Sequence, residues 1–216
     1  MEQYLPLREQ VVLAAKRMAA CKLVVGSAGN VSARVPGEDR FIITPSSLPY
    51  SEMKAEDTVI VDLEGNVLTE GRPPSMETVI HRRVYLVRPK VGAILHTHSL
   101  YASALSALRI PIPAFLEELV PYIGGPVAVA DYGPTASDEL AENACKALED
   151  RAAVLLANHG TLCVGVDLDR AFSVAELVEE AAQIYVLARS AGTPFELPPE
   201  SVEMHRMMYS YSKTKA

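Results

Sequence analysis

The chain has little that would indicate secretion, a membrane or a nucleic-acid partner. Its 216 residues include only three cysteines, Cys21, Cys145 and Cys163, and no Cys-x-x-Cys pair, which favours buried thiols in a reducing compartment. No apolar run approaches the roughly 20 residues that span a bilayer. The N-terminus lacks the basic and apolar regions of a signal peptide. We therefore expect a cytoplasmic protein.

Basic residues are also too few for a protein that binds nucleic acid. The formal net charge is −7, whereas such a protein needs a basic patch to neutralise phosphates. A small anionic ligand remains compatible, because backbone amides can bind one locally. No Gly-x-Gly-x-x-Gly follows a strand pattern, and no phosphate loop ending in Gly-Lys-Ser/Thr is present. A dinucleotide or ATP enzyme is therefore disfavoured.

Short apolar strands alternate with amphipathic helices along the chain, without an internal repeat or a linker. The 49% hydrophobic and 22% charged content is that of a globular protein, and the length fits one domain. We expect helices at 7–22, 75–86, 101–108, 137–148 and 168–191, and strands at 31–35, 40–44, 58–63, 67–70, 127–130, 153–157 and 161–166. This order predicts an α/β or α+β sandwich whose helices cover a mostly antiparallel sheet.

Three histidines follow two apolar runs and form a candidate metal site. The run 91–95 leads into His96 and His98, and alternation along a strand sends residues i and i+2 to the same face. His159 follows a second apolar run, 152–157. Three imidazoles with an open fourth position are the ligand set of a catalytic zinc. A lone His-x-His is more often a hydrogen-bonded pair, but the third histidine and an acidic residue upstream favour zinc.

The segments near these histidines offer further polar groups. Gly26 and Gly29 allow a tight turn whose amides could bind an anion, although an ordinary turn is equally compatible. Ser75 is a candidate helix N-cap, and Glu77 in the first turn would interact with the helix dipole. His81 lies four residues further, on the same face, and is expected to pack or hydrogen-bond rather than bind metal.

Five short segments match one known family when they are taken together. They are Gly26-Ser27-Ala28-Gly29-Asn30-Val31-Ser32, Ile43-Thr44-Pro45-Ser46, Pro74-Ser75-Met76-Glu77, His96-Thr97-His98 and Asn158-His159-Gly160. In this order and spacing the chain resembles the class II aldolase/adducin-head family from about residue 7 to residue 191. The resemblance implies one domain over residues 1–216, folded as a three-layer α/β sandwich with a central, mostly antiparallel sheet. It also implies a ring-like homotetramer.

The same resemblance implies roles for individual residues. His96, His98 and His159 would hold one zinc ion per chain, with Glu77 as the acid/base beside it. The family holds a substrate phosphate at the positions of Ser27, Asn30, Ser46, Ser47 and Ser75. The implied activity is cleavage of a ketose 1-phosphate, similar to L-fuculose 1-phosphate, to dihydroxyacetone phosphate and an aldehyde. No lysine lies in the matching segments, so a Schiff-base mechanism is not indicated.

At three positions the chain differs from family members that act on L-fuculose 1-phosphate. Met76 stands in place of a second serine, Ser47 in place of a glycine, and Glu117 in place of a catalytic tyrosine. We expect Glu117 to replace that tyrosine as proton donor to the aldehyde oxygen, at the zinc of a neighbouring subunit. A one-residue shift of the match would select Glu118 instead.

The resemblance leaves other functions open. A methylthioribulose-1-phosphate dehydratase of the same family uses a glutamate near position 117, and a phosphopentulose 4-epimerase is a further alternative. A non-catalytic adducin-type interaction module is less favoured, because it lacks the metal histidines. The tail 204–216 carries Tyr209 and Tyr211, which we expect to close over the site.

Overall fold

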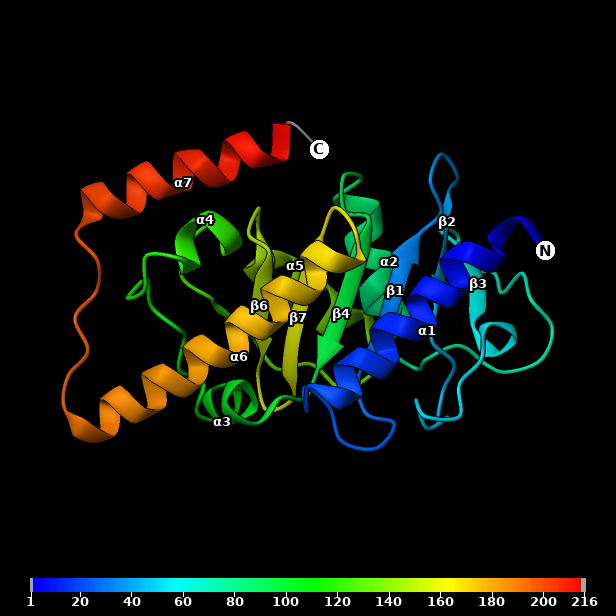
Figure 1. The fold of residues 1–216 in the computed structure, drawn as a ribbon, viewed down its shortest axis with the longest axis horizontal. Helices are drawn as coiled ribbons and strands as arrows, with labels where there is room; N and C mark the ends of the chain where they lie inside the picture. The colour runs from blue at the N-terminus through cyan, green and yellow to red at the C-terminus, as the bar shows by residue number, and fades with distance from the viewer. Residues whose placement is uncertain (1, 215–216) are drawn as a thin grey trace.

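One sheet forms the centre of the molecule. In the computed structural model, which describes residues 2–214, seven strands have the order β3-β2-β1-β4-β7-β6-β5 (Figure 1). Neighbouring strands are antiparallel, except that β5 and β6 are parallel. From edge to edge the strands are β3 (Val59–Asp62), β2 (Arg40–Ile43), β1 (Asn30–Arg34), β4 (Ala93–Thr97), β7 (Gly160–Gly165), β6 (Ala153–Leu156) and β5 (Val129–Ala130). The predicted, mostly antiparallel sheet is confirmed.

Helices cover both faces of this sheet and complete a three-layer α/β sandwich, as predicted. The face towards the viewer in Figure 1 carries α1 (Leu5–Ala20), α3 (Leu100–Leu108) and α6 (Leu168–Ala191). The far face carries α2 (Thr78–Val87) and α5 (Asp138–Leu148). At one end α4 (Leu119–Ile123) packs against α7 (Pro199–Thr214). None of the helices within residues 2–214 is both long and apolar enough to cross a membrane.

Local capping signals account for two of the helix starts. The Ser137 side chain accepts a hydrogen bond from the backbone N–H of Leu140, and α5 begins at the next residue after Ser137, as predicted. The Asp167 side chain accepts one from the N–H of Arg170 and starts α6, which has the predicted bounds. These side chains satisfy amide groups that a helix start leaves without partners.

The second predicted hairpin is only partly formed. Residues 67–70 form no strand, and Val67 makes only an isolated bridge with Val61. Val67 and Leu68 are both exposed, so this segment has no buried face that would favour a longer strand.

Ser75 is not the N-cap of α2, which was the predicted role. The helix begins at Thr78, with Glu77 at the N-cap position and no side-chain cap. The backbone N–H of Ser75 donates to the carbonyl of Thr44, so the chain at Ser75 is still paired with the segment after β2. The Glu77 carboxylate contacts histidines instead of capping the helix.

The C-terminal segment forms a helix that we did not predict from the sequence. Tyr209 of α7 is buried against Gly124, and its hydroxyl donates to the Asp150 carbonyl at 2.9 Å. Tyr211 is 61% exposed. Residues 215–216 of the expected tail lie outside the described residues.

The cysteines are free thiols, but their burial differs from the prediction. Cys163 in β7 is buried, Cys145 is half-buried and Cys21 is exposed. The expectation of buried thiols is therefore wrong for Cys21. Burial raises the pKa of the Cys163 thiol to about 12, which keeps it protonated near neutral pH.

Gly92, beside β4, lies so close to another backbone segment that a side chain has no room there. A Cβ atom at Gly92 would lie 2.0 Å from the carbonyl oxygen of Val166. We expect Gly92→Ala to lower the free energy of unfolding by about 1–3 kcal/mol, the usual cost of overpacking a core. Urea denaturation measures this change. Gly192→Ala is the matched control, since a Cβ there meets nothing within 4 Å, and it should stay within about 0.5 kcal/mol of the parent.

Candidate functional site

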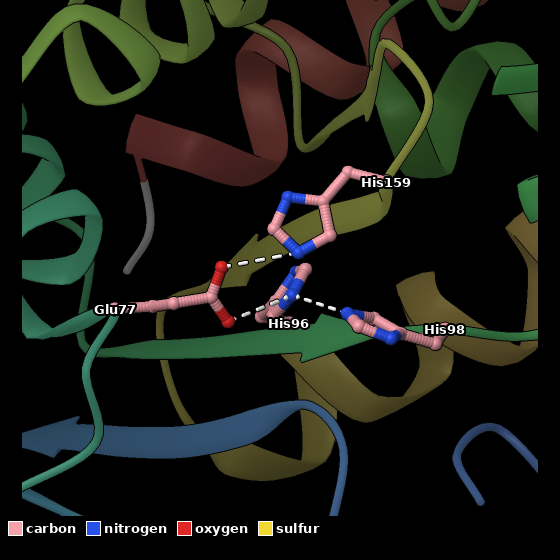
Figure 2. A group of neighbouring side chains, drawn as sticks. All are labelled: Glu77, His96, His98 and His159. Atoms are coloured by element: carbon pink, nitrogen blue, oxygen red, sulfur yellow. Dashed lines mark hydrogen bonds and ion pairs between the residues drawn. The ribbon is translucent and has the colours of Figure 1, made fainter. Parts of the chain in front are cut away.

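One helix start and the ends of two strands bring four candidate residues together (Figure 2). His96 lies in β4, His98 directly follows it, and His159 lies in the connection between β6 and β7. Glu77 reaches the same point from the start of α2. One ligand atom from each of these four residues can be chosen so that all lie within 4.8 Å of one another. The structure thus places His96, His98 and His159 together, as strand alternation and the second apolar run predicted.

The contacts within the cluster run through the Nε2 atoms of the histidines. The Glu77 Oε2 atom lies 3.0 Å from His96 Nε2, and its Oε1 atom lies 3.2 Å from His159 Nε2. His98 Nε2 is 2.8 Å from His96 Nε2. Three ring nitrogens and a carboxylate therefore face one small volume from different sides, as Figure 2 shows.

The tautomer of His96 follows from its other ring nitrogen. His96 Nδ1 lies 2.9 Å from the carbonyl oxygen of Thr161, which can only accept a hydrogen bond, so Nδ1 carries the proton. That leaves Nε2, which faces Glu77 and His98, as the ring nitrogen available to bind a metal ion. Such a backbone contact is the usual way in which a protein orients a metal-binding imidazole.

The electrostatics of the cluster also favour a bound cation. Burial alone would raise the pKa of the Glu77 carboxyl, but His96, His159 and Asn30 outweigh burial and lower it to about 2. Burial and the neighbouring imidazoles lower the pKa of His98 to about 4, and the pKa of His159 is lowered for the same reasons. At neutral pH an ionised carboxylate thus faces neutral His98 and His159, whose lone pairs can bind a metal ion.

An unsatisfied atom supports the same conclusion. Glu77 Oε1 is buried and accepts no hydrogen bond, although Oε2 accepts one from Asn30 Nδ2 at 2.9 Å. A buried carboxylate oxygen without a partner is costly unless a cation neutralises it. The donor set therefore fits a divalent metal ion.

The cluster opens into a cavity of about 690 Å³. Its lining includes Glu77, His98 and His159 together with all the predicted phosphate-binding residues, Ser27, Asn30, Ser46, Ser47 and Ser75. No lysine or arginine lines this cavity within residues 2–214, so an anion there would depend on hydroxyls, backbone amides and the metal.

Backbone contacts hold these serine-bearing segments beside the cluster. Pro45 and Pro74 form an isolated bridge, which brings Ser46 and Ser75 together from separate parts of the chain. The Tyr50 hydroxyl contacts the Gly29 carbonyl at 2.6 Å and so ties down the glycine-containing turn. Gly29 itself has φ +71°, and a Cβ there would lie 2.5 Å from the His96 carbonyl oxygen, so the turn needs glycine.

Two sets of predicted residues do not reach the cavity of their own chain. Glu117 and Glu118 lie in the turn before α4 and are exposed. Tyr209 instead lines a second cavity of about 690 Å³, at the opposite end of β4 and β7 beside Val91 and Val166. The C-terminal helix therefore does not close over the cluster of the same chain.

His81 lies in the core beside the candidate site. It is fully buried outside the metal cluster and contacts Asn30 and Ser32, in agreement with the predicted hydrogen-bonding role. The signal was present in the sequence, because Glu77, His81 and Tyr85 are spaced four residues apart and so share one helix face.

Comparisons with known proteins agree with this geometry. The model of the Class II Aldolase and Adducin N-terminal domain matches residues 9–186. The chain is 38% identical over 196 residues to a 5-deoxy-D-ribulose 1-phosphate aldolase of Bacillus thuringiensis, covering 91% of this chain and 92% of that protein. It is 35% identical over 197 residues to a 5-methylthioribulose-1-phosphate/5-deoxyribulose-1-phosphate aldolase of Rhodospirillum rubrum, covering 91% and 88%.

A solved structure shows the same fold as well as a related sequence. An L-fuculose 1-phosphate aldolase superposes with a TM-score of 0.89 at 38% identity, covering 95% of each chain. Residues 9–186, which the family model matches, include all seven strands and the four residues of the cluster. With its sequence and its fold in agreement, the chain belongs to the class II aldolase and adducin N-terminal domain family.

Proposed function

We propose that the protein is a zinc-dependent aldolase that cleaves a ketose 1-phosphate to dihydroxyacetone phosphate and an aldehyde. The observation that carries this proposal is the single cavity that joins the Glu77–histidine cluster to the serine hydroxyls. A ketose 1-phosphate has its carbonyl carbon next to the carbon that bears the phosphate, so one molecule can contact both parts. Three imidazoles with an open position favour zinc.

The residues of the chain supply binding and proton transfer. A bound zinc ion would act as a Lewis acid on the C2 carbonyl. Glu77 would take a proton from C3, the adjacent carbon, in the condensation direction and return it to C3 in cleavage. Its Oε1 atom is available for this transfer, since Oε2 is held by Asn30. In cleavage the C3–C4 bond breaks, the C4 hydroxyl gives its proton to the residue that donates it in condensation, proposed below as Glu117, and C4 becomes the aldehyde carbon.

The phosphate would lie at the other side of the cavity. The hydroxyls of Ser27, Ser46, Ser47 and Ser75 are uncharged donors there, and the turn at Gly26 and Gly29 adds backbone amides. The Asn30 amide lies between this region and Glu77, and it already donates to the carboxylate.

A panel of sugar phosphates tests the proposal. It comprises L-fuculose 1-phosphate, 5-deoxy-D-ribulose 1-phosphate and 5-methylthioribulose 1-phosphate, the substrates named for the similar proteins. A coupled assay for dihydroxyacetone phosphate should report cleavage of at least one. Consumption of substrate with loss of water, or its epimerisation, without this product would instead favour the dehydratase or the epimerase.

The metal assignment can be tested on purified protein. We expect one zinc ion per chain, and we expect His98→Ala to lose both the metal and the activity, because it removes one of the three imidazole ligands of the proposed site. Elemental analysis of the purified variant measures the metal. His205→Ala, a histidine in α7 outside the cluster, is the control and should keep the parental metal content. A full metal load in His98→Ala would contradict the assignment.

The role of Glu77 predicts a different outcome for its amide variant. Glu77→Gln should retain zinc through the three histidines but lose turnover by about 10²-fold or more, the typical contribution of a positioned acid or base. Steady-state kinetics and elemental analysis on the same preparation separate the two effects. If Glu77→Gln turns over as fast as the parent protein, Glu77 does not transfer the proton and only occupies the start of the helix.

Glu117 and Glu118 are exposed in the single chain, so either could serve only the cavity of another subunit. We propose that the chain, one domain over residues 1–216, works in the cytoplasm as a homotetramer in which Glu117 reaches a neighbouring zinc site. There it would donate a proton to the aldehyde oxygen in condensation.

This arrangement predicts an asymmetric pair of variants. One of Glu117→Gln and Glu118→Gln, with Glu117 favoured, should lower turnover by at least about tenfold, while the other stays near the parent, because neighbouring side chains point in different directions. Each variant serves as the control for the other, and the zinc content of both should be unchanged. If both turn over like the parent, the two glutamates are surface charges.

A further inference from the structure

A chain of buried polar groups runs from Glu77 into the core, away from the cavity. Asn30 Nδ2 donates to Glu77 Oε2 at 2.9 Å, and Asn30 Oδ1 lies 2.5 Å from His81 Nε2. His81 Nδ1 lies 2.6 Å from the Ser32 hydroxyl, which is 2.8 Å from the Tyr85 hydroxyl. The side chains are almost fully buried: Asn30 is 2% exposed, Tyr85 is 1% exposed, and Ser32 and His81 are not exposed.

This chain of polar groups forms because side chains on one face recur at similar distances along the strand and along the helix. Asn30 and Ser32 are alternate residues of β1, about 7 Å apart along a strand, and both face α2. Glu77, His81 and Tyr85 recur every four residues, about 6 Å apart along a helix. The side chains from the two elements therefore alternate, and each meets the next.

The donor and the acceptor can be assigned for each hydrogen bond between Glu77 and Tyr85. Because Asn30 uses its NH₂ group for the Glu77 carboxylate, its Oδ1 atom must accept, and His81 Nε2 must carry a proton. Burial lowers the pKa of His81 to about 3, so the ring is neutral and Nδ1 accepts. The Ser32 hydroxyl then donates to Nδ1, and the Tyr85 hydroxyl donates to Ser32.

We propose that His81 is a positioning residue for Glu77, acting through the Asn30 amide. His81 does not line the cavity, so it cannot touch the substrate. Its Nε2–H fixes the rotamer and orientation of the amide, and the amide in turn holds Oε2 of the carboxylate. Oε1 is then the oxygen directed at the reacting carbon. The proposal rests on the role assigned to Glu77 under the proposed function.

The test compares two substitutions of His81. His81→Leu removes both ring nitrogens, whereas His81→Gln keeps an N–H donor that can reach the Asn30 oxygen. We expect His81→Leu to lower kcat by at least about tenfold, as for other outer partners of metal-site residues, with unchanged KM and zinc content. We expect His81→Gln to recover most of the lost kcat.

Val84→Ala is the matched control for simple destabilisation. Val84 lies on the same helix, is fully buried and takes no part in the polar chain, so its truncation should lower the melting temperature without lowering kcat. The proposal is overturned if folded His81→Leu keeps the parental kcat, if Val84→Ala loses as much kcat, or if the glutamine variant recovers nothing.

A spectroscopic measurement on the parent protein keeps the proposal testable even if His81→Leu fails to fold. Nitrogen NMR of protein with ¹⁵N-labelled histidine, assigned by comparison with His81→Gln, reports which ring nitrogen of His81 carries the proton. We expect a neutral ring protonated at Nε2. Protonation at Nδ1 would mean that His81 does not donate to the Asn30 oxygen, and it would refute the proposal.

These outcomes remain distinct from a failure of the proposed function. If the aldolase proposal is wrong, the parent protein itself forms no dihydroxyacetone phosphate from the panel. If only the positioning role is wrong, the parent is active and Glu77→Gln is impaired, while His81→Leu turns over normally.

Discussion

The antiparallel pairing of β4 with β7 is the constraint on which the site depends. Its register places His96 opposite Leu162 and Thr97 opposite Thr161, so the connection that carries His159 comes beside the end of β4. Gly160 permits the close approach, since a Cβ there would lie 2.3 Å from the Thr97 carbonyl oxygen. Both strands are buried throughout, and a one-residue shift would turn every side chain to the other face. Backbone pairing in the sheet therefore holds His96 and brings the connection that carries His159 beside it.

Burial of the same site explains why its charges favour a bound cation. The surroundings that keep His98 and His159 neutral also enclose an ionised Glu77, one of whose oxygens has no hydrogen-bond donor. A cation resolves this imbalance, whereas removal of a single donor would leave a buried charge without compensation. The serine side of the cavity contains no cationic side chain among the described residues, so the metal would be the main positive charge available to a bound anion.

Strong local signals predicted much of the fold. The helix at 168–191 was predicted to the residue, and in the structure the Asp167 side chain caps its start and Gly192 follows its end. Other elements were missed: Val67 and Leu68 are exposed in a segment that forms no strand, and α7 was not predicted although Met204, Met207, Met208 and Tyr211 recur at helical spacing. Pro199 occupies the first position of α7, where proline often begins a helix.

The sequence by itself indicated which residues gather at the candidate site, because strand alternation and apolar runs act over a few residues. Spacing was enough to place His96 and His98 together, and the family motifs were enough to select Glu77 and the serines. Only the tertiary structure decided that Asn30 faces Glu77 on one side and His81 on the other. Those contacts join residues 47 and 51 positions apart, and they exist only when β1 and α2 pack with matching repeats. The direction of each hydrogen bond then follows from the hydrogen bonds beside it. No local sequence pattern contains this information, because the partners are far apart in the sequence.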